Sequence, residues 1–285
     1  MTRTIGNPLS WTAQAAGATG SHLADTAAEL GGTVDASPPQ VRILTRDDLR
    51  HALRAGWQDM IALRADALTL VAIYPLIGIT LIAMSFHAGL IPLIVPLIAG
   101  FALLGPVASV GLYEMSRRRE QGLETRWSDA FNVLSSPSFG AIAVLAVYLL
   151  GVMLVWMLLA AEIYGATLGP EPPVSVAAFV TDIFTTWRGW EMMLLGIVTG
   201  GMLAFAVLAM SVVSFPLLLD RKVGLPMAVV TSIRVTRANP DVILGWGLIV
   251  VVLLVLGSIP FLLGLVIVLP LLGHATWHLY RRAVG

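Results

Sequence analysis

The sequence contains no cysteine, which excludes disulfides, iron–sulfur clusters and thiol nucleophiles. Charge is also scarce, because only 12% of the 285 residues are charged, whereas a typical soluble domain has roughly 25%. The 17 basic residues include a single lysine, Lys222, and they balance 17 acidic residues to a net charge of zero. This balance gives no indication of a nucleic-acid partner, and the low charge argues against a soluble protein.

Hydrophobic residues make up 57% of the chain and are grouped in long runs without alternation. A run of about 20 apolar residues is the length that a bilayer core of about 30 Å requires. Because backbone groups in lipid must be hydrogen-bonded within their own segment, we expect these runs to be helices. The predicted fold class is an all-α membrane protein with about six transmembrane helices. The predicted spans are residues 67–86, 90–113, 139–161, 192–219, 242–256 and 261–280.

The first 40 residues differ in composition from the rest of the chain. They are rich in alanine, threonine, glycine and serine, and they end close to Pro38 and Pro39. Such a segment has too little apolar surface for a packed core, so we predict a disordered cytoplasmic tail over residues 1–40. A single polytopic membrane domain is expected over residues 41–284. The tail lacks the apolar core of a signal peptide, so the first span would serve as the targeting signal.

Basic residues predict the orientation, because loops rich in arginine and lysine stay in the cytoplasm. Only Arg188 falls in the loop between the third and fourth spans, where Glu171, Asp182 and Glu191 also lie. The other basic residues fall in the tail and the segment between it and the first span, in the stretches after the second and fourth spans, and at the C-terminus. Together with the even number of spans, this bias predicts that both termini are cytoplasmic.

Each of the three basic stretches that precede a pair of spans contains a segment with apolar residues on one helical face. The segments cover residues 45–64, 125–135 and 226–238, and each precedes a pair of predicted spans. The faces consist of Leu49, Leu53, Trp57, Met60 and Ile61, of Trp127, Ala130, Phe131 and Leu134, and of Pro226, Val229, Val230 and Ile233. We therefore expect three hairpins, each preceded by a cytoplasmic amphipathic helix. The layout indicates a parallel internal repeat, although basic residues at the ends of any membrane hairpins would produce a similar pattern.

His274 and His278 lie four residues apart and share a helix face near the cytoplasmic end of the sixth span. Such a pair can ligate a metal or a haem, and Glu114 and Asp220 end equivalent spans. The alternative places both histidines at the membrane interface beside Trp277, as members of an aromatic belt. Bis-histidine haem would need histidines in two facing spans, which the predicted layout does not supply. We therefore expect no metal and no cofactor.

Glu162 is the most deeply embedded carboxylate, because it follows an apolar run in the third span. An acid inside a membrane helix indicates function by default, but a position about one turn from the periplasmic end also lets the side chain snorkel to water. No predicted span carries a charge near its middle. Proton pumps and ion-coupled transporters normally need one, so both classes are disfavoured.

Two further patterns indicate contacts with neighbours. Gly196 and Gly200 form a GxxxG motif, extended by Gly201, which permits close helix packing within the chain or between chains. The periplasmic loop carries apolar residues at helical spacing. These residues, the periplasmic ridge, are Val176, Phe179, Val180, Ile183, Phe184 and Trp187. The ridge would either lie flat on the outer leaflet or dock a partner subunit.

Residues 41–284 resemble a bacterial family of uncharacterised integral membrane proteins that is common in alphaproteobacteria. The resemblance rests on residues 42–59, 105–114 and 235–240. The family is defined by layout, so it implies a helical protein of the bacterial inner membrane and no particular site residues. Some members are labelled as cytochrome-oxidase-like, but this sequence lacks the array of intramembrane histidines that haems and copper need.

No nucleotide-binding loop, nucleophile elbow or zinc-protease motif is present, and we expect no catalytic residues. The sequence favours a non-enzymatic accessory, assembly or stabilising subunit of a larger membrane complex, a respiratory complex being one option. Its expected partners are the lipid bilayer and other membrane protein subunits, without nucleic acid. The alternative is a transporter or lipid-handling protein, which would need a polar midplane cavity lined by Ser109, Thr199, Ser211 or Ser214.

Overall fold

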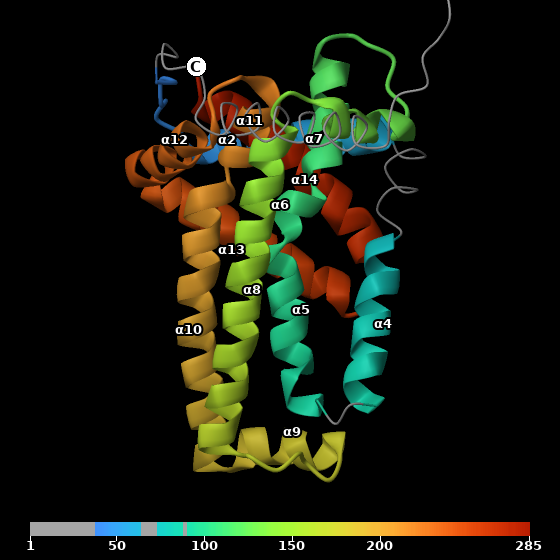
Figure 1. Ribbon diagram of the computed structural model, residues 1–285, viewed down its shortest axis with the longest axis vertical. Coiled ribbons are helices and arrows are strands. Elements are labelled where there is room, and N and C mark those ends of the chain that lie inside the picture. Colours follow the sequence, from blue (N-terminus) through green and yellow to red (C-terminus); the bar gives the residue numbers. More distant parts are fainter. Residues whose placement is uncertain (1–37, 64–72, 88–89) are drawn as a thin grey trace, which may run out of the picture.

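The computed structural model describes residues 38–63, 73–87 and 90–285. Within these ranges the chain is helical, without a strand, and has one isolated antiparallel bridge between Val41 and Val284. Long helices extend from a layer of shorter helices at one end, and α9 (Val176–Thr185) crosses the far end (Figure 1). Most of the predicted tail and the beginning of the first predicted span lie outside the described residues.

The described helices follow the chain in a simple order. They are α2 (Arg46–Ala62), α4 (Ile73–His87), η1 (Ile91–Leu93), α5 (Ile94–Leu103), α6 (Gly105–Ala108), α7 (Val110–Glu120), η2 (Trp127–Ser135), α8 (Phe139–Thr167), α9, α10 (Trp187–Ser211), α11 (Ser214–Asp220), α12 (Leu225–Ala238), α13 (Pro240–Ser258) and α14 (Leu265–Ala283). Two of them, η1 and η2, are 3-10 helices. The second predicted amphipathic segment is therefore wound more tightly than an α-helix.

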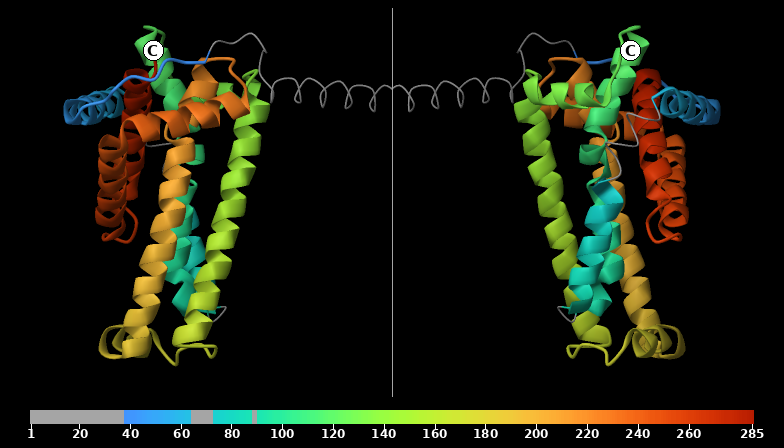
Figure 2. Two further views of the ribbon diagram at one scale, coloured as in Figure 1. Left: turned by 90° about the vertical axis from the view of Figure 1, so that its left-hand side faces the viewer. Right: turned by 90° about the vertical axis from the view of Figure 1, so that its right-hand side faces the viewer.

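One end of the molecule is a packed layer, which we call the basic layer (Figures 1 and 2). It consists of α2, the second half of α7, η2, α11, α12 and the second half of α14, and it contains most of the described arginines. Its largest buried side chains, at or next to the layer, are Tyr113, Phe215, Trp246, Trp277 and Tyr280. Much of the tight packing of this chain is therefore found in the basic layer.

The two ends of the described chain meet in this layer. The Arg42 backbone N–H donates to the Ala283 carbonyl at 2.9 Å. The Asn239 side chain holds the same segment, because its Oδ1 accepts the Leu44 N–H at 2.6 Å and its Nδ2 donates to the Arg42 carbonyl at 3.0 Å. Asn239 lies between α12 and α13, so one buried amide joins the segment before α2 to this corner.

Three described helical stretches are long and apolar enough to cross a membrane: α8, the stretch Trp187–Asp220 formed by α10 and α11, and α13. The described parts of α4 and α5 are shorter. α13 and α14 form a hairpin that ends well short of α9 (Figure 2). Its tip meets α4, because a Cβ on Gly78 would lie 2.7 Å from Leu262 Cδ1. The chain is thus an all-helical protein with apolar helices, and the arrangement of six full spans stays a prediction.

Two predicted spans are not continuous helices. The second is divided into α5, α6 and α7, and Pro106 lies in the first turn of α6, where a missing backbone N–H costs little. The fourth continues from α10 through residues 212–213 into α11, which carries Pro216 in its first turn. Proline therefore marks the starts of new helical segments here, because it cannot donate the hydrogen bond that a continuous helix requires.

The three predicted amphipathic segments bury only part of their apolar faces within the protein. Leu49, Met60 and Ala130 are buried, but much of each apolar face is exposed. The exposed members are Trp57, Ile61, Trp127, Phe131, Leu134, Pro226 and Val230. In α12 the fully buried side chains include Thr231 and Ser232. Small and polar side chains thus make many of the contacts inside the protein, and whether the three segments form a true repeat stays a prediction.

Candidate functional site

A candidate site begins where α2 crosses α14 with their backbones almost in contact. Gly56 of α2 faces Ala275 of α14, and a Cβ on Gly56 would lie 2.5 Å from the Ala275 backbone nitrogen. Ala52, one turn earlier on α2, is fully buried as well. Small residues permit this close approach between helices. It places Asp59, the next residue on the same face of α2, directly against α14.

Asp59 is the centre of a buried polar cluster that joins α2, α7 and α14. Its Oδ2 accepts hydrogen bonds from Ser116 Oγ at 2.7 Å and from His278 Nε2 at 2.8 Å. Its Oδ1 accepts a hydrogen bond from the Arg119 guanidinium. His274 Nδ1 lies 2.8 Å from Ser116 Oγ, and because the single Ser116 proton goes to Asp59, this nitrogen is the donor. We call these five residues the Asp59 cluster.

The cluster stabilises a negative charge in a buried position. The Asp59 side chain is only 5% exposed, and burial on its own would favour the neutral acid. Hydrogen bonds from His278 and Ser116, together with the charge of the histidines, outweigh burial and hold the pKa of Asp59 below its ordinary value of 3.8. Asp59 is therefore a carboxylate at neutral pH, paired with the Arg119 cation.

The geometry of the cluster suits a structural role, in which it holds α2, α7 and α14 together, better than catalysis. A serine beside a histidine can form a nucleophile–base pair, but the serine must then donate its proton to the histidine. Ser116 instead donates to Asp59, and Ser116 and His274 are both almost completely buried. Among the described residues, no group of three or more histidine, aspartate or glutamate side chains is placed to hold a metal ion.

The last turns of α14 carry a second set of polar contacts. Tyr280 OH donates to Asp220 Oδ2 at 2.5 Å, and Arg281 lies 3.3 Å from the same carboxylate. Arg281 also pairs with Glu120 at 3.1 Å, and Trp277 Nε1–H donates to Glu120 Oε2 at 3.0 Å. α14 therefore ties the end of α7 to the end of α11 through side chains.

A polar pocket of about 320 Å³ opens in the basic layer between α7, η2 and α11. Glu114 and Asp220 are its acidic lining residues, and Arg117, Arg221 and Lys222 are its cationic ones. The Glu114 side chain is only 3% exposed and accepts two hydrogen bonds from Arg117, from Nε at 2.8 Å and from Nη2 at 3.1 Å. This two-point pairing neutralises the buried acid at the base of the pocket.

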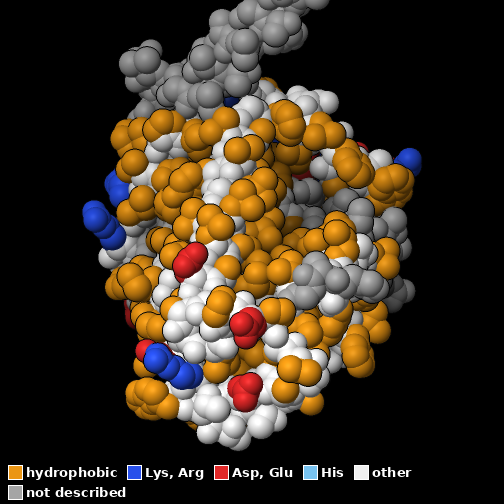
Figure 3. Space-filling model, turned by 60° about the horizontal axis from the view of Figure 1, so that its bottom comes forward, with side chains coloured by type: hydrophobic (Ala, Val, Ile, Leu, Met, Phe, Trp, Pro, Cys, Tyr) orange, Lys and Arg blue, Asp and Glu red, His pale blue; other side chains and the backbone are white. Residues whose placement is uncertain are grey.

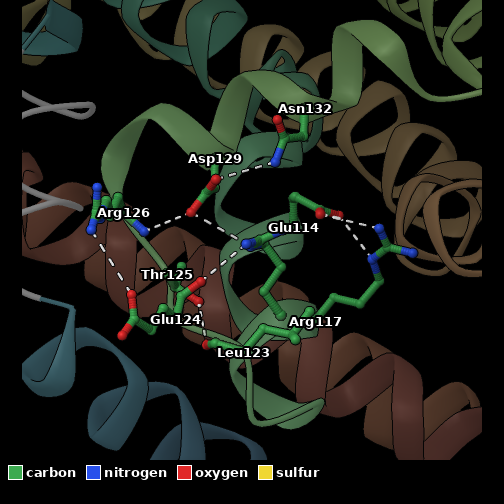
Figure 4. Close-up of polar contacts among 9 residues, drawn as sticks. Glu114, Arg117, Leu123, Glu124, Thr125, Arg126, Asp129 and Asn132 are labelled. Carbon is green, nitrogen blue, oxygen red and sulfur yellow. Dashed lines mark hydrogen bonds and ion pairs between the residues drawn. The ribbon is translucent and has the colours of Figure 1, made fainter.

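One wall of the pocket is η2, which hydrogen bonds hold in place (Figure 4). The Asp129 carboxylate accepts the Arg126 backbone N–H at 2.8 Å, as an acid at the third position of a helix commonly does. The same carboxylate lies 3.5 Å from Arg118 Nε and accepts a hydrogen bond from Asn132 Nδ2 at 3.3 Å. With η2 fixed in this way, Asn132 and Ser135 line the pocket.

Comparison with known proteins agrees with the helical architecture. Residues 93–220, less than half of the chain, match the model of a family described as predicted integral membrane protein (DUF2189). Two of the three stretches long enough to cross a membrane, α8 and Trp187–Asp220, lie within this match. This chain is an integral membrane protein. The match also supports its resemblance to an uncharacterised family, and no curated protein or solved structure matches the chain.

The candidate residues of the sequence fall at separate places in this membrane protein. Glu114 and Asp220 come together at the pocket, whereas His274 and His278 belong to the Asp59 cluster. Glu162 is exposed on α8, towards the end of the molecule that carries α9. Glu114, Asp220 and His278 therefore do not share one site.

Three residues of the Asp59 cluster, Asp59, Ser116 and Arg119, belong to no motif that the sequence indicates as a site. Asp59 follows Gly56 by three positions on the buried face of α2. An acidic residue on a buried helix face is the feature that could have indicated this site in the sequence. Ser116 and Arg119 belong to a run of basic residues and look ordinary in the sequence. Trp277, expected in an aromatic belt at the lipid interface, is fully buried because it packs inside the basic layer.

The glycines of α10 have two different surroundings. Gly200 packs against Trp156 of α8, since a Cβ on Gly200 would lie 2.9 Å from the indole ring. The same indole donates its Nε1–H to the Pro96 carbonyl of α5 at 2.8 Å, so Trp156 links three helices. A Cβ on Gly196 or Gly201 would meet nothing within 4 Å. Gly200 thus serves packing inside the membrane protein, whereas the other two glycines have free space beside them.

This difference predicts opposite outcomes for matched substitutions. Gly200→Val should destabilise the protein by about 1–3 kcal/mol, because the added methyl groups collide with the Trp156 ring. Gly196→Val should leave stability almost unchanged, because its side chain points into open space. Thermal unfolding in mild detergent, followed by intrinsic tryptophan fluorescence, measures both. Equal losses in the two variants would contradict the packing described for Gly200.

Most of the periplasmic ridge forms α9, as its spacing predicts, and α9 crosses the end of the molecule at which α8 ends and α10 begins (Figure 1). The last ridge residue, Trp187, is instead the first residue of α10, because the backbone is extended at Thr186. Phe179 is buried and stacks edge-to-face on Tyr164 of α8 with 6.0 Å between ring centroids. Ile183 is half-buried, whereas the remaining members are exposed. These are Val176, Val180, Phe184 and Trp187. Hydrophobic side chains cover much of this end of the molecule, among scattered acidic groups (Figure 3).

Proposed function

We propose that this membrane protein is not an enzyme and acts as an accessory, assembly or stabilising subunit of a larger complex in the bacterial inner membrane. The basic layer would then face the cytoplasm, as the positive-inside rule favours. The observation that carries the proposal is the loose packing of α8 and α13, whereas the corresponding part of Trp187–Asp220 is 56% buried. Only 22% of the most apolar 18 residues of α8, and 22% of those of α13, are buried within the chain.

Glycines on α8 and α10 favour protein neighbours on part of the apolar surface of these helices. A Cβ on Gly151 of α8, or on Gly196 or Gly201 of α10, would meet nothing within 4 Å. In a bilayer, small residues at a helix surface permit another helix to come close and to gain packing contacts. A partner helix would thus find positions on α8 and α10 where no side chain holds it away.

The use of charge in the basic layer also supports a role based on contacts. The buried carboxylates of Asp59 and Glu114 are each paired with an arginine of α7. Breaking such pairs is expensive. The Glu114–Arg117 pair lies within α7, whereas the contacts of Asp59 with Arg119 and His278 favour one fixed arrangement of α2, α7 and α14. A rigid layer of this kind would present the membrane helices to a partner in a constant position.

The alternative function, a transporter or lipid-handling protein, has less support. Its expected hydroxyl groups include Ser211 and Ser214, which are buried and donate to the carbonyls of Val207 and Met210 in the preceding turn. Neither serine lines the pocket of the basic layer. A hydroxyl that bonds its own helix is already satisfied and gives little guidance to a polar substrate.

Extraction into native nanodiscs, followed by native gels and mass spectrometry of co-purifying proteins, tests the proposal. We expect the wild-type chain to migrate with a reproducible set of membrane proteins. Gly201→Leu should reduce their recovery without changing thermal stability, because the leucine would occupy the space a partner helix needs. Leu123→Phe adds bulk at an exposed position between α7 and η2, away from α8, α10 and α13, and serves as the control. Recovery of the wild-type chain only as a lone monomer would argue decisively against the proposed role.

A further inference from the structure

We infer that the polar pocket of the basic layer binds the phosphate-bearing headgroup of an anionic phospholipid. This inference is independent of the accessory role, because it concerns a bound lipid and not a protein partner. The pocket volume of about 320 Å³ lies within the range of small-ligand sites, roughly 300–1,000 Å³. The pocket also lies beside Ser138, the residue at which α8 leaves the basic layer.

The charges around the pocket favour an anion. Its two carboxylates already have cationic partners within the protein, Glu114 with Arg117 and Asp220 with Arg281. Among the described residues, Lys222 makes no ion pair or side-chain hydrogen bond, and its side chain is exposed at the pocket. The charge left without a partner is therefore positive, so an anionic group would complete the site.

Hydrogen-bond donors surround this cation. Ser136 and Ser138 line the pocket in the link between η2 and α8, and Asn132 and Ser135 line it from η2. Ser138 is the residue before α8 and makes no capping hydrogen bond with its side chain. Hydroxyl and amide groups beside a cation are the donor set that phosphate oxygens accept, and the start of α8 adds a positive end of a helix dipole.

The apolar surface beside the pocket favours a lipid as the source of the phosphate. The outer face of η2 exposes Trp127, Phe131 and Leu134, which are 48%, 49% and 60% exposed. Trp127 and Phe131 stack edge-to-face with their ring centroids 6.1 Å apart. Phe139, at the start of α8, is exposed as well. Aromatic side chains are enriched at the membrane–water interface, so the same wall offers donors to a headgroup and apolar contacts to acyl chains.

Native mass spectrometry of the full-length protein with added phosphatidylglycerol or phosphatidylcholine tests this inference. We expect the wild type to retain phosphatidylglycerol selectively. Lys222→Glu should weaken that binding about tenfold, since each cation near an anionic lipid surface contributes about 1 kcal/mol. Arg234→Glu changes the net charge equally on exposed α12, outside the pocket lining, and should leave the binding unchanged.

A second measurement uses the single lysine of the sequence. Phosphatidylglycerol should protect Lys222 from an amine-reactive reagent, whereas inorganic phosphate and glycerol phosphate should not. Equal protection by the soluble phosphates would show a site for free phosphate compounds and would overturn the lipid assignment. Equal retention of phosphatidylcholine, or equal weakening by Lys222→Glu and Arg234→Glu, would overturn the anionic headgroup site. Thermal unfolding of both variants verifies that each is folded.

Discussion

Gly56→Ala is expected to destabilise this membrane protein by about 3 kcal/mol, although the same change usually stabilises a helix. The added Cβ would lie 2.5 Å from the Ala275 backbone nitrogen and 2.7 Å from its Cα. A backbone atom cannot rotate away as a flexible side chain can, so α2 and α14 would have to separate. Their separation would also pull Asp59 away from His278, and the loss would therefore include hydrogen bonds as well as packing.

Gly151→Ala provides the matched control for this prediction. Gly151 lies within α8, and its added Cβ would meet nothing within 4 Å. Replacing glycine by alanine inside a helix ordinarily gains about 0.5–1 kcal/mol, because alanine loses less backbone freedom on folding. The two variants should thus shift the melting temperature in opposite directions, as read by tryptophan fluorescence in mild detergent. A higher melting temperature for Gly56→Ala would mean that α2 and α14 do not cross as described.

The sequence patterns predicted the helical class and several local features for clear physical reasons. Long apolar runs must form helices in lipid, and three described stretches have the required length and composition. The spacing of the periplasmic ridge predicted a helix where α9 lies, because its apolar residues recur at the period of an α-helix, although Trp187 belongs to α10. These features depend on neighbours in the chain, so a single sequence contains the information needed to predict them.

The Asp59 cluster could not be predicted in the same way. Asp59 and His278 are 219 positions apart, and nothing in the local sequence of either residue indicates the other. Their contact depends on the close crossing at Gly56, and a lone glycine in a helix usually has no such role. Similarly, the exposure of Trp57 and Trp127 could not be inferred from periodicity. An apolar face predicts which side chains avoid water, but in a membrane protein lipid satisfies them as well as a protein core does.

The pocket illustrates an intermediate case. Glu114 and Asp220 are acids at the ends of equivalent predicted spans, and the structure brings both to one pocket. Their partners Arg117 and Arg281 could not be assigned from the sequence, because arginines are abundant throughout these stretches. The two acids alone indicate an acidic site, whereas the lining also contains Arg117, Arg221 and Lys222, and the charge left unpaired is that of Lys222. The chemistry of the pocket therefore depends on which charges are already paired.

The second large effect is expected for Asp59→Asn, which keeps the shape of the side chain and removes its charge. Ser116, His278 and Arg119 all donate to this carboxylate, and an amide group must present a donor to at least one of them. Removing one partner of a buried ion pair typically costs roughly 3–5 kcal/mol, and the partial exposure of Arg119 places this case near the lower end. Asp47→Asn on the same helix is the control, because Asp47 and Arg50 are both largely exposed and such pairs contribute little.

The pH dependence of the same comparison tests whether the charge of Asp59 is responsible. The pKa of Asp59 is lower in the folded protein than its ordinary value of 3.8, so folding favours the ionised form. The resulting stabilisation is complete above the unfolded value and is lost as the pH falls through the lowered folded value. The difference in melting temperature between the wild type and Asp59→Asn should therefore be present at neutral pH and should shrink as the pH falls below 3.8. A difference in melting temperature that stays constant in acid would assign the effect to shape and packing. The stability of the Asp59 cluster would then not depend on the carboxylate charge.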